Sequence, residues 1–230
     1  MKQTCLSFLT LAVFFVSSGP TQAQSVFGPI LHYESFNDSP FKGLPFSYFH
    51  LETFEEGALT APGVTASAGF VIGPGPEIDS VDGGGNNGHS FYNPDGTAGI
   101  MFTFDKGVLG HLPTHAAIAW TDGDGPNRYF KAFDANGNLI GSIVDSTPGF
   151  IIDQGDGDPS NYRLFGAVDP LGISAIFIAD DDQPQVGIEV DHLQYGYQAV
   201  PEPATLTLCS VAAVAGLVAY RRKRRSPALA

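Results

Sequence analysis

The sequence predicts an all-β fold, an antiparallel β-sandwich or jelly roll of about nine strands. Short apolar runs alternate with clusters of Gly, Pro, Asn and Asp, and no stretch of residues 24–199 has sustained helical periodicity. Many short strands separated by turn clusters are typical of sandwiches and jelly rolls. The predicted strands are Phe49–Phe54, Gly69–Ile72, Gly99–Phe104, Ala116–Trp120, Tyr129–Phe133, Leu139–Val144, Arg163–Val168, Ser174–Ile178 and Gly187–Val190.

Alternation within these runs predicts which side chains face the core. Ile100, Phe102 and Phe104 are spaced two apart, and residues at this spacing share one face of a strand. Trp120 alternates in the same way with Ile118 and is therefore assigned to the core. In the last run, Ile188 and Val190 alternate with Glu189 and Asp191, which predicts a half-buried sheet with these carboxylates on the opposite face.

One hairpin is well marked. Asp134-Ala135-Asn136-Gly137-Asn138 separates two of the apolar runs. The Asn-Gly pair favours positive φ at both turn positions, as in a two-residue hairpin turn. Residues 24–48 contain prolines and many aromatic side chains, which predicts an ordered lead-in segment or an edge strand.

The N-terminus predicts a secretory signal peptide over residues 1–23. Lys2 supplies a basic start, an 11-residue run from Leu6 to Val16 is largely apolar, and small residues lead to Ala23. The apolar run is too short to span a bilayer, which takes about 20 residues. We expect signal peptidase to cut between Ala23 and Gln24.

The C-terminus predicts a membrane anchor. Residues 204–220 are 17 uncharged, mainly apolar residues, near the lower limit for a spanning helix. By the positive-inside rule, the basic residues that follow should stay in the cytoplasm and stop transfer. Both ends then place residues 24–199 outside the cytoplasm. The basic residues are Arg221, Arg222, Lys223, Arg224 and Arg225.

Charge and cysteine content constrain the part between the ends. Residues 24–199 carry five Lys and Arg against 23 Asp and Glu, a formal charge of −18. That balance argues against nucleic acid, which needs Lys and Arg against phosphate, and is compatible with divalent cations. Cys5 and Cys209 lie in the predicted targeting segments, so this domain has no disulfide.

The tail resembles a known sorting signal. Val200, Pro201, Glu202 and Pro203 precede the apolar segment and the Arg-rich end, and this ordered triple is similar to the PEP-CTERM signal. Some classifications label the same tail an ice-binding protein C-terminal domain, but the core lacks the regular threonine array of a flat ice-binding face. The resemblance implies that an exosortase in the inner membrane of a Gram-negative bacterium processes the tail. The protein would then reach the cell surface or the extracellular matrix.

Residues 49–196 resemble a jelly-roll module found in such exported proteins, for which no activity can be carried over. Taken together, these observations divide the chain into four parts: a signal peptide at 1–23, a lead-in segment at 24–48, a β-sandwich at 49–199 and a sorting signal at 200–230. Glu56 stands where the relatives have Asp, which weakens a metal role for this residue. The motifs that carry the resemblance are His50–Gly57, Pro62–Thr65, Gly99–Asp105, Leu112–His115, Trp120–Gly123, Phe133–Asp134 and Gly187–Gly196.

Acidic residues in the first and last firm strands suggest a calcium site. Carbohydrate-binding jelly rolls often hold calcium between these strands, and a hard cation takes six to eight oxygen ligands. Glu52, Glu55 and Asp191 are the candidate ligands. The competing interpretation is that they are solvent-facing carboxylates of a very acidic protein.

Other polar clusters carry weaker hypotheses. The loop Asp122–Asn127 and the clusters Asp153–Asp158 and Asp180–Asp182 could wrap a cation, but Asp and Gly favour turns for backbone reasons alone. His111 and His115 have the spacing of a helical zinc pair, yet Pro113 between them favours ordinary polar histidines.

The function predicted is a non-catalytic, polysaccharide-associated module of an exported surface or matrix protein. No nucleophile elbow, zincin or Walker motif is present. Aromatic side chains could stack on sugars, and Phe91 and Tyr92 beside a Gly-Asn loop are the predicted exposed pair. The alternatives are a structural spacer without glycan binding and a polysaccharide-modifying enzyme. Exosortase, signal peptidase and extracellular polysaccharide are the expected partners.

Overall fold

The computed structural model describes residues 23–75, 78–82, 87–123, 126–146, 161–181 and 187–198, and positions 212, 215, 216 and 221 of the C-terminal segment. Residues Gln22–Ala199 form one compact unit, and the two chain ends are grouped separately from it. The predicted signal peptide up to residue 22 lies outside the described residues, as does nearly all of the predicted sorting signal. Within the described part of the chain, no helix is both long and apolar enough to span a membrane.

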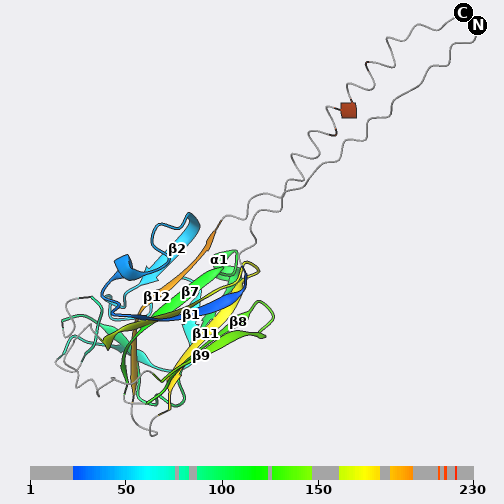
Figure 1. Ribbon diagram of the computed structural model, residues 1–230. Helices are drawn as coiled ribbons and strands as arrows, with labels where there is room; N and C mark the ends of the chain where they lie inside the picture. The colour runs from blue at the N-terminus through cyan, green and yellow to red at the C-terminus, as the bar shows by residue number, and fades with distance from the viewer. Residues whose placement is uncertain are drawn as a thin grey trace, which may run out of the picture. The chain divides into compact units, whose positions relative to one another are not determined.

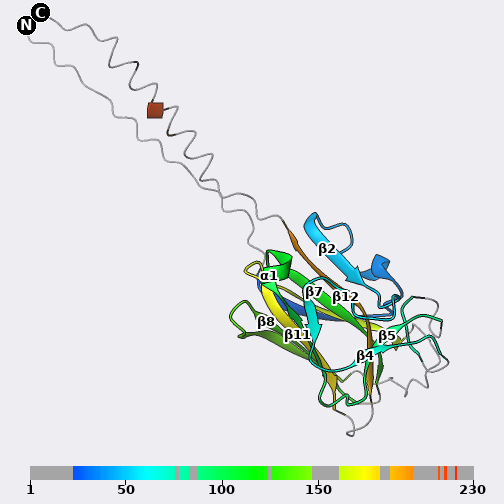
Figure 2. The ribbon, with the colours of Figure 1, turned by 180° about the vertical axis from the view of Figure 1, so that it is seen from behind.

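The described residues form twelve strands in two antiparallel sheets, which confirms the all-β sandwich (Figures 1 and 2). The first sheet has the order β1-β10-β7-β12-β5-β4, with β2 also paired to β12, and the second has the order β3-β6-β11-β8-β9. The first sheet contains β1 (Ser25–Leu31), β2 (Phe46–Glu52), β4 (Phe70–Ile72), β5 (Ser90–Asn93), β7 (His115–Gly123), β10 (Arg163–Val168) and β12 (Ile188–Gln198). The second contains β3 (Val64–Ala66), β6 (Ile100–Phe104), β8 (Arg128–Asp134), β9 (Leu139–Asp145) and β11 (Ile173–Asp180).

Each of the nine predicted strands corresponds to an observed one, and three strands are additional. β1 is an edge strand that pairs with β10 and falls within residues 24–48, where an edge strand was one of the two expectations. β3 and β5 have three and four residues. Strands of this length show too few repeats of a periodicity of two for the sequence pattern to indicate them strongly.

The main core lies between the two sheets. It is built from the alternating side chains Ile100, Phe102 and Phe104 of β6, with Ile118 and Trp120 of β7 facing them, as predicted. Thr103, between two of these β6 residues, is exposed, so β6 buries one face only. The sandwich therefore derives its stability mainly from apolar burial between the sheets.

The hairpin between β8 and β9 is present, but its turn differs from the prediction. Among its turn residues, Gly137 has positive φ, at 80°, while Asn136 does not. The Gly137 amide donates to the Asp134 carbonyl at 3.0 Å, and the Asp134 carboxylate accepts from the amides of Asn136 and Asn138. The Asp134 side chain therefore stabilises a longer turn that ends in a left-handed glycine, with an irregular register at Ala132 and Phe133.

In the central strands β10, β7 and β12 of the first sheet, the other face is also buried, which corrects the expectation of a half-buried last strand. Glu189 and Asp191 are both buried although they point away from the main core. The segments 33–46 and 78–82, together called the cover, lie over this face. Tyr33 and Phe41 of the cover pack against Ala117 and Ala119 of β7, Tyr162, Leu164 and Val168 in a second apolar cluster.

A β-bulge in β12 determines which of its side chains face the main core and which face the cover. Asp191 pairs with Ala119 and Gln194 pairs with Ala117, so two residues of β12 oppose one residue of β7. His192 sits in this bulge with φ of 48°. Because of the extra residue, Leu193 joins the main core while Asp191, His192 and Gln194 all contact the cover.

His115 should make the cover sensitive to acid. Its buried ring lies edge-on to Phe41 and Phe46 of the cover, at centroid distances of 5.2 and 5.1 Å, and burial lowers its pKa to about 4. The folded state therefore keeps His115 neutral while the unfolded chain takes up a proton below about pH 6.5. We expect up to about 3 kcal/mol of stability to be lost as the pH falls from 6.5 towards 4.

Urea unfolding of the wild type and of His115→Leu across this pH range would measure the effect. The comparison must be made between the two proteins, because the raised pKa of Asp191 acts in the same window with the opposite sign. A stability difference between the two proteins that does not change with pH would contradict the prediction.

Candidate functional site

The three predicted calcium ligands are buried or hydrogen-bonded within the protein. The Glu52 carboxylate accepts from the amides of Phe54 and Thr60 at 3.1 and 2.9 Å, and from the Thr60 hydroxyl at 3.0 Å. These bonds fold the chain after β2 back onto the strand. The Glu52 carboxylate thus has a structural role in this loop.

Glu55 and Asp191 both contact Ser80 of the cover. The Ser80 hydroxyl lies 3.1 Å from an Asp191 oxygen and 3.4 Å from a Glu55 oxygen, and Asp191 also accepts from the Val81 amide at 2.8 Å. Full burial raises the pKa of Asp191 to about 7. Among the described residues, no three acidic, His or Cys side chains gather closely enough to hold a metal ion. The calcium site stays a prediction.

The residues of the proposed zinc pair and of the acidic loops lie in different surroundings. His111 is exposed and contacts Tyr197, whereas His115 is buried beneath the cover, so the two imidazoles have different surroundings. Asp122 lies in β7, where its carboxylate accepts from the neighbouring Gly123 amide. Asp124, Asp153, Asp156, Asp158 and Asp182 lie outside the described residues.

A buried polar network joins the cover to β12, and no sequence motif indicated it. Gln194 donates to the Tyr33 hydroxyl at 2.8 Å, and this hydroxyl lies 2.9 Å from Nδ1 of His192. The other ring nitrogen of His192 lies 3.0 Å from Asp82, and Ser39 donates to Gln194 at 2.6 Å. Tyr33 is fully buried and burial raises its pKa, so this chain of groups holds the cover rather than meeting a substrate.

The prediction that Phe91 and Tyr92 are both exposed is wrong for Phe91. Phe91 is buried in the main core against Phe54 and Phe102. Tyr92 points to the opposite face of β5 and is half-buried, edge-on to Phe70. Consecutive strand residues face opposite sides of a sheet, so both rings of an adjacent pair in β5 could not be exposed on one face.

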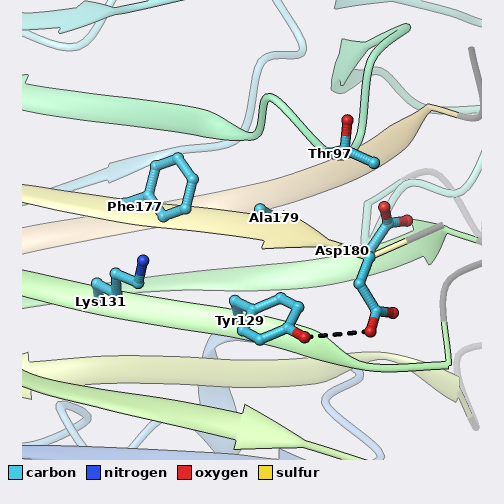
Figure 3. Close-up of a pocket in the computed structure, with 7 residues that line it drawn as sticks. Thr97, Tyr129, Lys131, Phe177, Ala179 and Asp180 are labelled. Carbon is cyan, nitrogen blue, oxygen red and sulfur yellow. Dashed lines mark hydrogen bonds between the residues drawn. The ribbon is translucent and has the colours of Figure 1, made fainter. Parts of the chain in front are cut away.

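The exposed aromatic site lies instead on the outer face of the five-stranded sheet. A pocket of about 450 Å³ opens there at the ends of β8 and β11 (Figure 3). This is within the range of sizes found for small-molecule sites. Its lining residues are Thr97, Tyr129, Lys131, Phe177, Ala179, Asp180 and Asp181.

Strand register places these side chains together. Phe177 of β11 pairs with Lys131 of β8, and Ala179 pairs with Tyr129. The intervening residues Phe130 and Ile178 point into the core, so the paired residues face outward. The small side chain of Ala179 leaves the floor of the pocket open between the two aromatic rings.

Polar contacts hold the side chains that line this pocket in place. The Tyr129 hydroxyl donates to Asp181 at 3.1 Å, and this bond raises the pKa of Tyr129. The Asn127 amide donates to the other Asp181 oxygen at 2.9 Å. The Lys131 ammonium lies 5.4 Å from the centre of the Phe177 ring, within the range of a cation–π contact. The pocket therefore combines the aromatic rings of Tyr129 and Phe177 with the Lys131 ammonium and the carboxylates of Asp180 and Asp181.

The sequence contained part of this site. Tyr129 and Phe177 occupy outward positions of predicted strands, since each alternates with a core residue. The pairing of β8 with β11 brings together residues about 48 positions apart. Alternation assigns faces to each strand separately and does not say which strands are neighbours.

Comparison with known proteins gives fold-level likenesses only. No family model matches the chain, and no curated protein matches it. A cleaved adhesin domain of Lys-gingipain from Porphyromonas gingivalis is 12% identical, with a TM-score of 0.43, over 66% of this chain and 100% of that one. The C-terminal family 22 carbohydrate-binding module of Clostridium thermocellum Xyn10B is also 12% identical, with a TM-score of 0.40, over 70% and 99% of the two chains.

A third solved structure is a family 11 carbohydrate-binding module from Clostridium thermocellum, in complex with a β-1,3-1,4-mixed-linked tetrasaccharide. It is 13% identical, with a TM-score of 0.23, and the match covers 70% of this chain and 94% of that one. Likenesses this distant carry no argument about function. The functional inference rests on the residues of the pocket.

Proposed function

We propose that residues 24–199 form a non-catalytic module that binds polysaccharide through the pocket on the outer face of the five-stranded sheet. The observation that carries the proposal is the pair of half-exposed rings, Tyr129 and Phe177, on one open face with polar groups at its rim. Aromatic faces stack on the apolar C–H faces of sugars, while hydroxyl and charged groups bind sugar hydroxyls.

The charge of the domain narrows the ligand class. Its formal charge is −18, and Asp180 and Asp181 line the pocket against one Lys. A polyanionic glycan would be repelled by this field. We therefore propose a neutral glycan as the ligand, with Thr97, Lys131 and Asp181 as hydrogen-bonding partners for its hydroxyls.

Export and sorting complete the proposed function. The signal sequence, the Pro201-Glu202-Pro203 motif, the apolar run at 204–220 and the basic end support anchoring in the inner membrane. Exosortase-dependent delivery to the cell surface or matrix would then bring the domain into contact with extracellular polysaccharide. Calcium binding by Glu52, Glu55 and Asp191 is a further proposal within this function.

Affinity electrophoresis of residues 24–199 through neutral extracellular polysaccharide tests the pocket. We expect the wild type to be retarded, and Phe177→Ala and Tyr129→Ala each to bind roughly two- to tenfold more weakly, since an aromatic contact contributes about 0.5–1.5 kcal/mol. Phe70→Ala is the matched control, because Phe70 is 55% exposed but lies on β4 of the other sheet.

The outcomes separate the hypotheses. No retardation of the wild type would favour the structural spacer, and loss of retardation in Phe70→Ala alone would move the site to the other sheet. Repeating the run with calcium and then with chelator tests the metal. Retardation that disappears with chelator would make Glu52, Glu55 and Asp191 the next residues to substitute.

A further inference from the structure

Both ends of the domain emerge at the same end of the sandwich, here called the stem end. It comprises α1 (Lys106–Leu109), the loop that follows it to Thr114, the turn 169–172, and the ends of β1 and β12 (Figures 1 and 2). Gln24 donates to Asp169 at 3.2 Å, the Gln198 amide donates to the Thr114 hydroxyl at 3.3 Å, and the Asp169 amide donates to the Thr114 carbonyl at 2.9 Å.

The stem end exposes apolar and aromatic side chains. Val108 of α1 is 64% exposed, and Leu171 in the neighbouring turn is 86% exposed. Tyr197, near the end of β12, stacks on Tyr48 at a centroid distance of 5.6 Å and also contacts His111 at 5.2 Å. Tyr48 also contacts Tyr195, which is buried in the core, so the rings of Tyr195, Tyr48 and Tyr197 form a row that runs from the core towards the end of β12.

Charge is low at this end of a very acidic domain. Within the residues that define the stem end, the charged side chains are Lys106 and Asp169, and Asp169 is buried; Asp105 immediately precedes α1. The carboxylates of the pocket lie at the opposite end of β11. This strand begins at Ile173, whose amide bonds to Pro113 of the stem end at 2.8 Å, and ends at Asp180 in the pocket.

Chain length brings the stem end close to any membrane that holds the predicted anchor. Five residues, 199–203, separate Gln198 from the apolar run that begins at Ala204. A fully extended chain of this length spans no more than about 20 Å. The argument rests on the anchoring that forms part of the proposed function.

We propose that the stem end contacts the outer surface of the lipid bilayer while the tail is uncleaved. Tyr side chains are enriched at membrane interfaces, and exposed aliphatic residues such as Val108 and Leu171 can enter the headgroup region. The short tether supplies a high effective concentration of bilayer. The formal charge of −18 opposes binding of the free domain to anionic lipid, so cleavage of the tail would release it. While the tail is uncleaved, the pocket at the opposite end of β11 would point away from the membrane.

Quenching of introduced tryptophans by brominated lipid tests the contact. The chain from Gln24 to Ala230 is reconstituted into phosphatidylcholine–phosphatidylglycerol vesicles with brominated acyl chains. Val108→Trp and Leu171→Trp probe the stem end, and Ala98→Trp, an exposed position beside the pocket, is the matched control. The single native Trp120 is buried in the core and provides the background to subtract.

We expect the introduced Trp at 108, at 171, or at both to lose most of its emission in brominated vesicles and to shift to shorter wavelength, with neither change at 98. Equal quenching at all three positions, or none at 108 and 171 in chains that float with the vesicles, would overturn the stem-end contact and leave anchoring intact. Failure of the chain to float with vesicles would overturn anchoring and the contact together. The pocket prediction is independent of each result.

Discussion

Replacing Asp145 with alanine should lower the free energy of unfolding by about 3–5 kcal/mol, because it leaves two buried guanidinium groups without their shared carboxylate. One Asp145 oxygen lies 3.2 Å from Nε of Arg128 and 3.4 Å from Nε of Arg163. All three side chains are buried. Burial lowers the pKa of Arg163 to about 10, and the neighbouring Asp145 carboxylate opposes this shift by favouring the cation.

The two ion pairs of Asp145 connect strands of different sheets. Asp145 ends β9 and Arg128 begins β8 in one sheet, while Arg163 begins β10 in the other. The carboxylate therefore links the two sheets at one corner of the sandwich. Urea or thermal unfolding measures the change, and Glu56→Ala, which removes an exposed carboxylate, is the control and should change stability by less than about 0.5 kcal/mol. Equal effects of the two substitutions would contradict the role assigned to Asp145.

Replacing Trp120 with alanine should cost a similar amount, about 3–5 kcal/mol, for a different reason. Trp120 is fully buried in the main core, and the Arg128 guanidinium lies 5.4 Å from the centre of its ring. Truncation removes apolar contacts and leaves a cavity that β-strands fixed on both sides cannot close.

Chemical denaturation of Trp120→Ala beside Phe70→Ala measures this effect. The control removes an aromatic side chain that is 55% exposed and should lose far less stability. In a domain of this size, each kcal/mol corresponds to a melting temperature lower by roughly 2–4 °C. A loss below about 1 kcal/mol for Trp120→Ala would show that the core can collapse around the missing ring.

Local pattern was sufficient for the strands and for one face of each. The alternation of Ile100, Phe102 and Phe104 identifies a strand and its buried side, because side-chain direction repeats every two residues in any sheet. The same rule fails for Glu189 and Asp191, which carry charge and yet are buried. Their burial depends on the cover, whose Asp79 and Val81 amides donate to them from more than 100 residues away.

For the pocket, too, local pattern predicts the direction of each side chain but not which strands are neighbours. The sequence places Tyr129 and Phe177 on the outward side of two strands, but it does not make those strands neighbours. Their closeness depends on the antiparallel pairing of β8 with β11 and on a register that sets Phe177 beside Lys131. A shift of one residue in that register would turn the rings into the core.

The sequence by itself determined the all-β class, nine of the strands, the core position of Trp120 and the acidic character of the domain, and it predicts targeting signals at both ends. These properties depend on composition and on periodicities of a few residues, which any short stretch of chain displays. Only the tertiary structure decided that the central strands of the first sheet are buried on both faces, that Asp145 links the two sheets, and that the rings of the pocket lie on one surface. Those outcomes depend on contacts between residues far apart in the chain, which no local pattern encodes.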